Sequence, residues 1–299
     1  MPPADPETTV DAPAVVDILS AAPGHLLRRS LAVFNAVWAE TVGEPTSAQF
    51  GVLAALALQP RIDQRALGEL ASLDRSSTTD VVRRLARQSW LVKSRDPEDA
   101  RRSVLELSLP AQHALAGLLP RVDAAHEQLL SPLTAPERTD LLASLRTLAD
   151  VPAEAAAFPA LVTPGFLLRR AQQRHTALFA EHVGEGLTGS QFAVLTALHH
   201  CPGISHRTLR GMIAIDRTTV TGIVERLTAK GWVARERDPD DARKFRLALT
   251  PLAEGTYAAT AERVAVVQKQ LVAPLGSSAR ERVQSLLRRV AFARPFPTD

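Results

Sequence analysis

Apolar residues recur every three or four positions along most of this chain, and this spacing predicts a mainly helical protein. Leu27, Leu31 and Phe34 form one such stripe within the first predicted helix. Thr46 is a suitable N-cap for the second helix, and Pro60 ends it because proline cannot continue a helix. The helices predicted in the first half of the chain cover residues 24–42, 46–58, 64–72, 75–88, 111–130 and 136–149.

A different pattern interrupts the helices after residue 88. Two short apolar runs, residues 90–92 and 104–107, predict strands, and the polar residues 95–102 between them predict a hairpin tip. The two short helices before this hairpin are joined by a tight turn, which is typical of a helix-turn-helix unit. A helix-turn-helix unit followed by a hairpin predicts a winged helix.

The same series of elements occurs twice. Residues 46–109 align without a gap with residues 188–251, at roughly 40% identity. Upstream of this block the two copies align at a shift of 141 instead of 142, so one residue was inserted near Gly186. The chain is therefore predicted to be two copies of one fold, fused head to tail. The helices predicted in the second copy include residues 165–183, 206–214, 217–230, 252–272 and 278–291.

The repeats set the predicted domain boundaries, at residues 23–150 and 166–299. Residues 1–22 begin with an acidic, proline-rich stretch and are predicted to form a flexible arm. Residues 151–165 are predicted to be a linker, because Pro152, Pro159 and Pro164 interrupt any helix. The last two helices of each copy carry apolar stripes too long for one winged helix to bury. We therefore expect helical dimerisation regions in which these helices pack against the other copy, within a mainly α fold with small β-hairpins (α+β).

Composition supports two soluble domains and adds little about partners. The 299 residues carry a net charge of only +3, but 31 of the 35 basic residues are arginines, whose planar donor groups suit phosphates and base edges. A genome rich in G and C explains the arginines equally well. Cys201 is the only cysteine, so no disulfide forms within the chain. With no long apolar run or export signal in the sequence, we expect a cytoplasmic protein without membrane contact.

The outward face of the fourth predicted helix of each copy is the candidate DNA-reading surface. Thr78, Val81, Val82 and Leu85 point inward at helical spacing, so Ser76, Asp80, Arg83 and Arg87 point away, flanked by Ser77 and Thr79. Short hydroxyls at a helix N-terminus can bond phosphates or base edges, and an arginine can reach guanine or phosphate. The alternative interpretation is that this helix face is exposed to solvent and binds nothing.

The hairpin tip is the second candidate contact. Arg101 and Asp99 lie two residues apart on one face of the strand, and Arg243 and Asp241 repeat the arrangement. A guanidinium held in this way can enter a narrow minor groove, where the negative potential is high. A surface salt bridge in a turn would look the same, but the order of elements, found twice, favours DNA binding.

Together these motifs resemble the multiple-antibiotic-resistance regulator (MarR) family of winged-helix repressors. The resemblance rests on the Thr-x-x-Gln-Phe helix, the Asp-Arg-Ser-Ser-x-Thr segment, the Arg-Asp-Pro-x-Asp-x-Arg hairpin tip and the Leu-Ser or Leu-Thr-Pro strand end, and it covers each half of the chain. It implies DNA contacts from the recognition helices and the wings, and it implies no enzyme activity. The implied DNA-binding residues are Arg75, Ser76, Ser77, Thr79, Arg83 and Arg101 in the first copy and Arg217, Thr218, Thr219, Thr221 and Arg243 in the second, with Asp99 and Asp241 supporting the wings.

The fusion changes what the resemblance implies about assembly. Members of the family usually act as homodimers on double-stranded DNA, whereas here both copies share one chain. We therefore expect a single-chain pseudodimer that binds an operator as a monomer, with recognition helices about one DNA turn, roughly 34 Å, apart. Further association of chains stays open.

The two copies differ on the outward helix face. Asp80 is matched by Gly222, and Arg83 by Glu225. We therefore expect an imperfect palindrome whose one half-site is read more tightly through Arg83. Drift at solvent-facing positions is the alternative.

The resemblance also implies a small aromatic or phenolic effector in a cleft between the dimer helices and the winged helix. Arg28, Trp38, Arg169 and His175 lie on the first helices and are the candidate lining residues, although core packing or solvation explains them equally well. The sequence His199-His200-Cys201, with His206, contains metal-ligand types, but consecutive positions at a helix end diverge by about 100° and the first copy lacks these residues. We therefore predict no metal and no cofactor, and no nearby residue marks Cys201 as a redox sensor.

No enzyme motif is present: the sequence has no phosphate loop, nucleophile elbow or paired-histidine zinc motif. The prediction is a sequence-specific, ligand-responsive DNA-binding repressor. The alternative is a pseudodimeric ligand-binding or protein-interaction module that has lost DNA binding.

Overall fold

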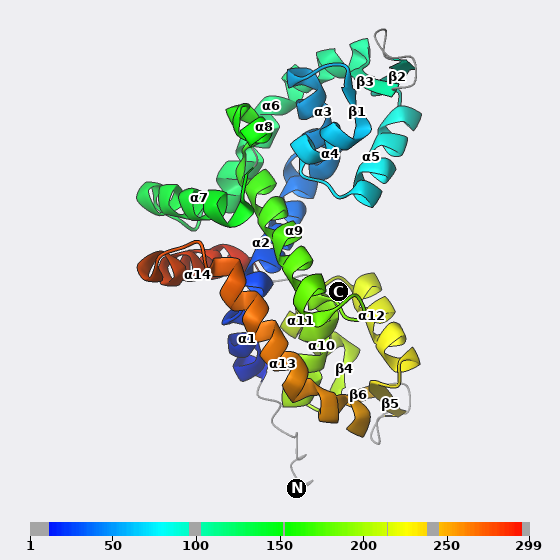
Figure 1. The fold of residues 1–299 in the computed structure, drawn as a ribbon, viewed down its shortest axis with the longest axis vertical. Helices are drawn as coiled ribbons and strands as arrows, with labels where there is room; N and C mark the ends of the chain where they lie inside the picture. Colours follow the sequence, from blue (N-terminus) through cyan, green and yellow to red (C-terminus); the bar gives the residue numbers. More distant parts are fainter. Residues whose placement is uncertain (1–11, 96–102, 152, 214, 238–244, 295–299) are drawn as a thin grey trace, which may run out of the picture. The chain divides into compact units, whose positions relative to one another are not determined.

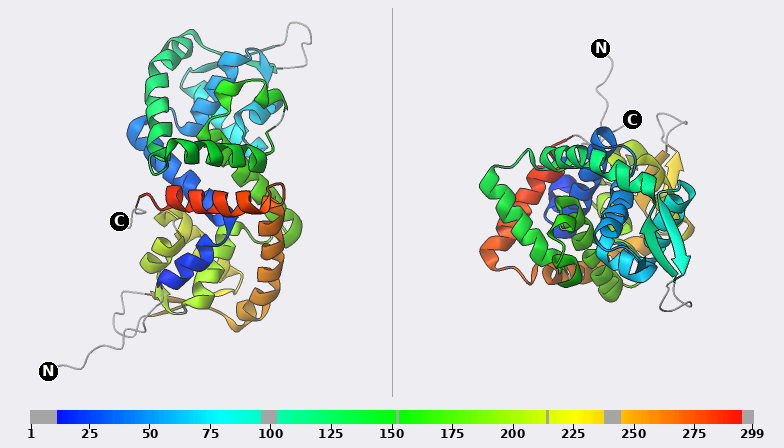
Figure 2. Two further views of the ribbon diagram at one scale, coloured as in Figure 1. Left: turned by 90° about the vertical axis from the view of Figure 1, so that its left-hand side faces the viewer. Right: turned by 90° about the horizontal axis from the view of Figure 1, so that it is seen from above.

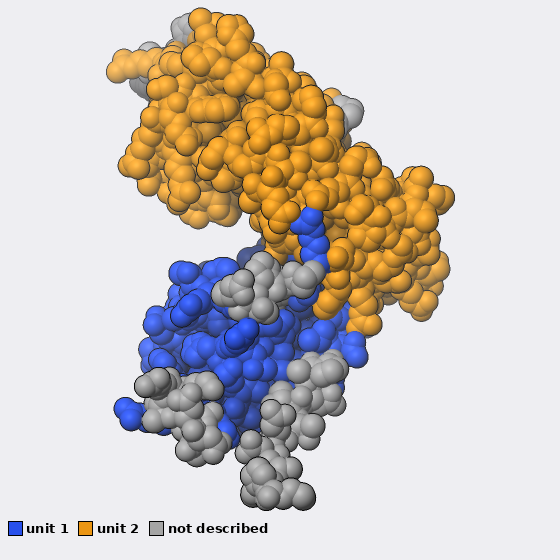
Figure 3. All heavy atoms as spheres, turned by 180° about the vertical axis from the view of Figure 1, so that it is seen from behind, with its two compact units in different colours: residues 1–29, 175–274, 294–299 blue, residues 30–174, 275–293 orange. Residues whose placement is uncertain are grey.

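The computed structural model of the chain describes residues 12–95, 103–151, 153–213, 215–237 and 245–294. It is mainly helical with two small three-stranded antiparallel sheets, which confirms the predicted fold class (Figure 1). The chain divides into two compact units (Figure 3). Unit 1 takes in the described parts of residues 1–29, 175–274 and 294–299, and unit 2 takes in residues 30–174 and 275–293.

Unit 2 contains the first winged helix. Its elements are α3 (Ser47–Leu58), β1 (Ile62–Asp63), α4 (Gln64–Ala71), α5 (Arg75–Arg87), β2 (Leu91–Arg95) and β3 (Ser103–Leu107). The sheet has the order β1-β3-β2, and Lys93 pairs with Leu105 at the centre of the hairpin. The predicted Thr46 cap is confirmed: Thr46 and Gln49 form a capping box, in which each side chain bonds the other's backbone N–H.

Two helices follow this winged helix in the chain and a third, distant in sequence, joins them in unit 2. They are α6 (Leu109–Leu130), α7 (Ala135–Ala149) and α14 (Ser277–Ala291). α14 packs along α7, where the red and green helices run side by side in the left view (Figure 2). Ion pairs join the two helices, from Arg289 to Glu137 at 2.6 Å and from Arg282 to Asp140 at 3.2 Å. The last helix of the second repeat thus packs against the last helix of the first.

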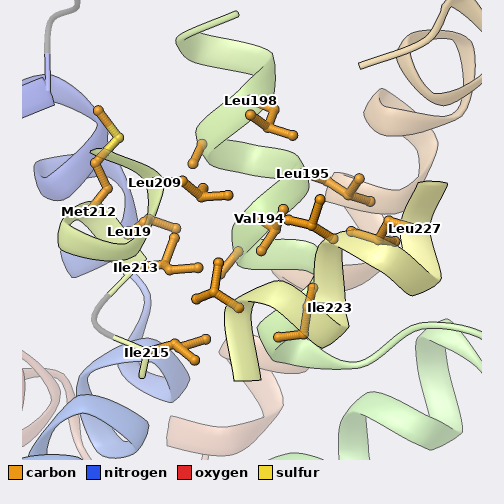
Figure 4. Close-up of a cluster of buried hydrophobic side chains, with 14 of the residues drawn as sticks. Leu19, Val194, Leu195, Leu198, Leu209, Met212, Ile213, Ile215, Ile223 and Leu227 are labelled. Carbon is orange, nitrogen blue, oxygen red and sulfur yellow. The ribbon is translucent and has the colours of Figure 1, made fainter. Parts of the chain in front are cut away.

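Unit 1 contains the second winged helix, with the same order of elements. They are α10 (Gly189–His200), β4 (Ile204–Ser205), α11 (His206–Ile213), α12 (Arg217–Ala229), β5 (Val233–Arg237), β6 (Phe245–Leu249) and α13 (Pro251–Val272). Leu195 and Leu198 of α10, Leu209 of α11 and Leu227 of α12 meet in its apolar core (Figure 4). The recognition helix is therefore held by buried contacts with the other two helices of the winged helix.

The structure differs from the prediction of a flexible arm over residues 1–22. Residues 12–20 form a helix, α1 (Ala12–Ser20), which packs on α10 and α11. Val15 and Leu19 are buried in the core of unit 1, with exposed fractions of 1% and 5%, and Leu19 lies beside Ile213 and Leu209 (Figure 4). Burial of these apolar side chains, spaced i and i+4, explains why the segment is ordered.

The predicted linker also contains short helices. α8 (Ala153–Ala156) packs on α4, and the 3-10 helix η1 (Pro159–Leu161) packs on α3. Pro164 does not interrupt a helix but begins one, α9 (Pro164–Val183), because a proline at the first helical position loses no hydrogen bond. The linker is therefore part of unit 2 rather than a free tether.

The compact units do not follow the predicted domain boundaries. α2 (Pro23–Thr41) contributes residues 23–29 to unit 1 and residues 30–41 to unit 2. α9 likewise contributes residues 164–174 to unit 2 and the rest to unit 1. Each unit is thus completed by segments from the other repeat.

Candidate nucleic-acid interface and effector pocket

The face of α5 that was predicted to read DNA is exposed. Of the four residues predicted to point inward, Thr78, Val82 and Leu85 are buried, with exposed fractions of 2%, 7% and 0%, and Val81 is partly buried. The outward positions, Arg75, Ser76, Asp80, Arg83 and Arg87, are exposed, and Ser77 and Thr79 are partly so. The helical spacing read from the sequence is therefore confirmed for this helix.

Asp74 organises the N-terminus of α5. Its carboxylate accepts hydrogen bonds from the Ser77 backbone N–H at 2.8 Å and from the Ser76 and Ser77 hydroxyls, both at 2.7 Å. Partial desolvation opposes ionisation of Asp74, but these hydrogen bonds outweigh it and lower its pKa to about 2. Because both hydroxyl protons point to Asp74, Ser76 and Ser77 offer acceptor lone pairs to an approaching base or amino group.

Thr79 connects the two helices of the helix-turn-helix unit. Its hydroxyl donates to the Arg75 carbonyl at 2.8 Å and accepts from the Gln64 side-chain amide at 3.0 Å. Gln64 is the first residue of α4, so this contact ties the start of α4 to the reading face of α5. No role was predicted for Gln64, because nothing in the local sequence shows that it lies beside Thr79.

Arg83 is paired within its own helix. Its guanidinium lies 3.1 Å from the Asp80 carboxylate, three residues earlier, and both side chains are more than half exposed. An exposed i,i+3 pair of this kind is weak, so Arg83 can leave it for a phosphate or a base. The negative charge of Asp80 nevertheless lies on the proposed DNA face.

In unit 1, α12 repeats the capped N-terminus. Asp216 accepts from the Thr219 backbone N–H at 2.9 Å, and hydrogen bonds from the Thr219 side chain and backbone lower the Asp216 pKa. Thr221 donates to the Arg217 carbonyl at 2.9 Å, as Thr79 does to Arg75. The predicted contact residues Arg217, Thr218, Thr219 and Thr221 are all exposed. Both repeats thus present an N-capped, hydroxyl-bearing helix start.

The wing tips that were predicted to enter the minor groove lie outside the described residues. These predictions concern Arg101 and Asp99 in the first copy and Arg243 and Asp241 in the second. The strands that carry the tips are described, and in unit 1 the Arg235 guanidinium lies over the Phe245 ring, 4.8 Å from its centroid. Lys93 and Ser103 occupy the matching positions of the first wing, so the first wing cannot form this stack of an arginine on an aromatic ring. The signal for this stack in the sequence is an aromatic residue, Phe245, directly after the arginine-bearing hairpin tip.

Unit 2 also contains a pocket beneath its winged helix. Its volume is about 30 Å³, and it is partly open to solvent. Aromatic rings form its walls: Phe34 stacks on His126 at 5.5 Å between ring centroids, and Trp38 lies against Phe50 at 5.4 Å. Gly165 and Phe166 of α9, with Leu161 of η1, line another side. The pocket is thus small, and its walls are mainly apolar and aromatic.

Arg169 of α9 supplies the charge of this pocket. Its guanidinium donates to the Ala71 carbonyl at 3.3 Å and to the Ser47 hydroxyl at 3.5 Å, both long contacts. Desolvation by burial lowers its pKa to about 10, and no carboxylate of the described residues forms an ion pair with it. A partly buried cation beside aromatic walls suits a ligand with a carboxylate on a ring.

A related cluster lies in unit 1. The Arg28 guanidinium donates to the Ile213 carbonyl at 2.8 Å and lies 3.0 Å from His25 Nδ1. His175 Nε2 lies 3.1 Å from the Gln268 side-chain amide, which is itself bonded to the backbone N–H of Gly24 at 2.8 Å. The structure therefore separates the four predicted lining residues, with Trp38 and Arg169 in the pocket of unit 2 and Arg28 and His175 in unit 1.

The histidines near Cys201 do not converge on a metal site. His199 Nδ1 lies 2.6 Å from Glu254, and the imidazole stacks on Tyr257 at 4.1 Å. Cys201 is buried in the core of unit 1, with an exposed fraction of 4%. Within the described ranges no group of three metal-ligating side chains occurs.

Comparison with known sequences identifies both repeats. The pattern of the MarR family matches residues 46–103 and, separately, residues 187–245. The transcriptional repressor NicR of Pseudomonas putida is 44% identical over 87 residues, a stretch that covers 29% of this chain and 55% of NicR. The chain thus spans about half the length of that relative.

Other relatives match over more of their own length. The transcriptional regulator HosA of Escherichia coli O111:H- is 28% identical over 114 residues, which cover 38% of this chain and 84% of HosA. Among solved structures, the PcaV regulator of Streptomyces coelicolor in complex with its natural ligand is 36% identical, with a TM-score of 0.41, and the match covers 50% of this chain and 98% of PcaV.

Of the helices that the structure describes, none is long and apolar enough to cross a membrane.

Proposed function

The chain belongs to the MarR family of transcription regulators, and from this premise we propose that it is a ligand-responsive, sequence-specific repressor in which one chain serves as a pseudodimer. The observation that carries the proposal is the repetition of one surface. α5 and α12 each begin at an aspartate cap, expose threonine or serine hydroxyls and a leading arginine, and are followed by a hairpin. One chain therefore carries two recognition helices, one for each half-site of a palindromic operator.

The interdependence of the two units supports action as a single chain. Unit 2 includes α14 from the end of the second repeat, and α2 and α9 each contribute residues to both units. A repeat cut out of this chain would lack segments that complete its compact unit. The proposed reading unit is consequently the whole chain bound to one operator.

The pocket of unit 2 supports ligand control. Phe34, Trp38 and Phe50 offer ring surfaces, and Arg169 supplies a cation that lacks an ion-pair partner among the described residues. We propose a small aromatic acid as the effector, with its carboxylate on Arg169 and its ring against Phe34 and Trp38. The pocket borders α3 and α4 of the winged helix through Phe50, Leu70 and Ala71, so an occupant would bear on the helices that position α5.

An electrophoretic shift on the DNA upstream of the gene, at several salt concentrations, tests the proposal. Binding that weakens steeply with salt and saturates at one chain per site, measured by analytical ultracentrifugation of the complex, is the expected result. Arg101→Ala and Arg243→Ala should each weaken binding. Arg263→Ala, which removes the same charge from an exposed position on α13, serves as the control.

Two outcomes would contradict the proposal in different ways. Saturation at two chains per site would refute the pseudodimer but leave the DNA-binding role intact. No shift on this DNA or on random fragments would favour the interaction module that has lost DNA binding.

A further inference from the structure

The pocket of unit 2 and the cluster of unit 1 occupy matching places in the two repeats, but their chemistry has diverged. At a shift of 141 or 142, Arg169 corresponds to Arg28 and Ala71 to Ile213, and both arginines donate to the matching carbonyl. Three neighbouring positions differ in kind. They are Phe34 against His175, His126 against Gln268 and Phe166 against His25.

From this divergence we infer that only the pocket of unit 2 takes the aromatic acid, so that each chain binds one effector molecule and not two. The inference rests on the proposed function, because it concerns the effector of the same regulator. It assigns the two arginines different roles: Arg169 binds ligand, whereas Arg28 is held by the protein itself.

In unit 1, a chain of hydrogen bonds ties up the groups that would line a second pocket. The Gly24 N–H donates to Gln268 Oε1, which leaves the Gln268 amide nitrogen as the donor to His175 Nε2. His175 must therefore be neutral, with its proton on Nδ1. An aromatic ligand placed here would have to break these bonds and leave buried polar groups without partners, which costs free energy.

Arg28 is engaged in the same way. The imidazole of His25 offers its Nδ1 lone pair to the guanidinium at 3.0 Å, in addition to the Ile213 carbonyl. The corresponding residue in unit 2 is Phe166, which cannot accept a hydrogen bond, so Arg169 keeps donors for a ligand. At Arg28, a ligand carboxylate would have to displace the His25 imidazole or the Ile213 carbonyl. At Arg169, it would bind to guanidinium donors that remain available.

Burial and polarity point the same way. His25 and His175 have exposed fractions of 8% and 5%, and burial together with the nearby Arg28 lowers the pKa of both rings. The unit 1 site is thus lined by polar groups where unit 2 has ring and aliphatic surface, and an aromatic ring gains less from entering it.

Isothermal titration calorimetry of the full chain tests the inference, with benzoate and 4-hydroxybenzoate as probes. Phenol and cyclohexanecarboxylate are the controls for the carboxylate and for the ring. We expect 1 ligand per chain. Arg169→Ala should weaken binding by about 10-fold to 100-fold, as expected for loss of a charged hydrogen bond, whereas Arg28→Ala should keep the stoichiometry and the affinity. Thermal unfolding of both variants checks that they are folded.

The outcomes separate this inference from the proposed function. Two equivalent sites per chain, or binding that Arg28→Ala abolishes and Arg169→Ala spares, would overturn the inference while leaving a ligand-binding regulator. No binding of either aromatic acid to the wild type would refute the aromatic-acid effector itself, and the inference with it.

Exchanging the three divergent residues provides a second, independent test. The variant H25F/H175F/Q268H gives unit 1 the side chains of unit 2, and we expect it to bind 2 ligands per chain. The reciprocal variant F34H/H126Q/F166H should lose binding. If the first variant folds and still binds only 1, these three positions do not determine the difference between the sites. If the reciprocal variant folds and still binds 1, the ligand does not occupy the pocket of unit 2 and the inference fails.

Discussion

Gly68 lies so close to Thr78 that a Cβ atom at position 68 would come within 2.5 Å of the Thr78 hydroxyl oxygen. Gly68 is in α4 and Thr78 is on the buried face of α5, so this contact sets how closely the two helices of the helix-turn-helix unit approach. In the second repeat the matching residues are Arg210 and Val220, both buried. The two helix-turn-helix units therefore pack by different means.

Gly68→Ala should destabilise unit 2 because the added methyl group forces α4 and α5 apart. Overpacking of this kind costs about 1–3 kcal/mol. Urea unfolding monitored by circular dichroism measures the change. Gly117→Ala on α6 is the matched control: nothing lies within 4 Å of its added Cβ, so helix propensity alone should make it neutral or slightly stabilising.

Asp74→Ala should cost about 1 kcal/mol of stability, because α5 loses the side chain that caps its N-terminus. It also frees the Ser76 and Ser77 hydroxyls, so we expect DNA affinity to change together with stability. Asp74→Asn keeps a capping oxygen and should recover most of the stability. If Asp74→Ala and Asp74→Asn unfold at the same urea concentration, the cap does not stabilise the helix.

Asp80→Ala should strengthen DNA binding by about threefold to tenfold at low salt. The change removes a negative charge from the proposed DNA face and releases Arg83 from its 3.1 Å ion pair. Fluorescence anisotropy at several salt concentrations should show a steeper salt dependence than for the wild type. Asp123→Ala, an exposed position on α6, removes the same charge elsewhere and should leave the affinity unchanged. Weaker binding by Asp80→Ala would mean that Asp80 itself contacts the DNA.

Protonation of Glu137 should lower the stability of the fold at acidic pH. Hydrogen bonds from the Thr134 backbone and from Arg289 lower the pKa of Glu137 to about 2. The lowered value means that its stabilising contribution is complete above the carboxyl's ordinary pKa and is lost as the pH falls towards 2. Glu137→Gln should therefore lower the urea midpoint at pH 7 and reduce its decline between pH 5 and pH 2. An unchanged decline would show that the contact between α7 and α14 does not depend on this charge.

Protonation of His175 should lower the stability of the fold at a less acidic pH than protonation of Glu137. Burial and the charge of Arg28 lower its pKa from 6.5 to about 4, so the unfolded chain binds a proton more readily than the folded chain. Stability is then complete above about pH 6.5 and falls as the pH decreases towards 4. His175→Phe should flatten the stability profile in this window, while His113→Phe, at an exposed position on α6, should not. Equal slopes for wild type and His175→Phe would contradict the neutral, buried ring.

The sequence was most informative where one helix face decides the structure. The cap at Thr46 and the exposed faces of α5 and α12 follow from local residue types and the helical period, and all were predicted. The effector pocket was predicted only as a set of first-helix residues. Spacing along one helix does not tell which residues of another repeat will complete a pocket, so Phe34, His126 and Phe166 were missed.

The segments outside the repeats were predicted least well. α1 and α8 are short, with Pro13 inside the first and prolines on both sides of the second, so the local pattern favours an arm and a linker. They are ordered because Val15, Leu19 and Ala155 are buried by other parts of the fold. Long-range burial of this kind is not visible in the spacing of the segment itself.

The assignment of α14 to unit 2 has a consequence for synthesis on the ribosome. Unit 2 begins at residue 30 but includes residues 275–293, which are translated after the whole of the second winged helix. Until those residues emerge, α7 lacks the helix that packs along it, and Glu137 lacks its arginine partner. The first repeat to be made is therefore completed only near the end of translation, and the nascent chain carries an uncovered apolar face on α7 for about half of its translation.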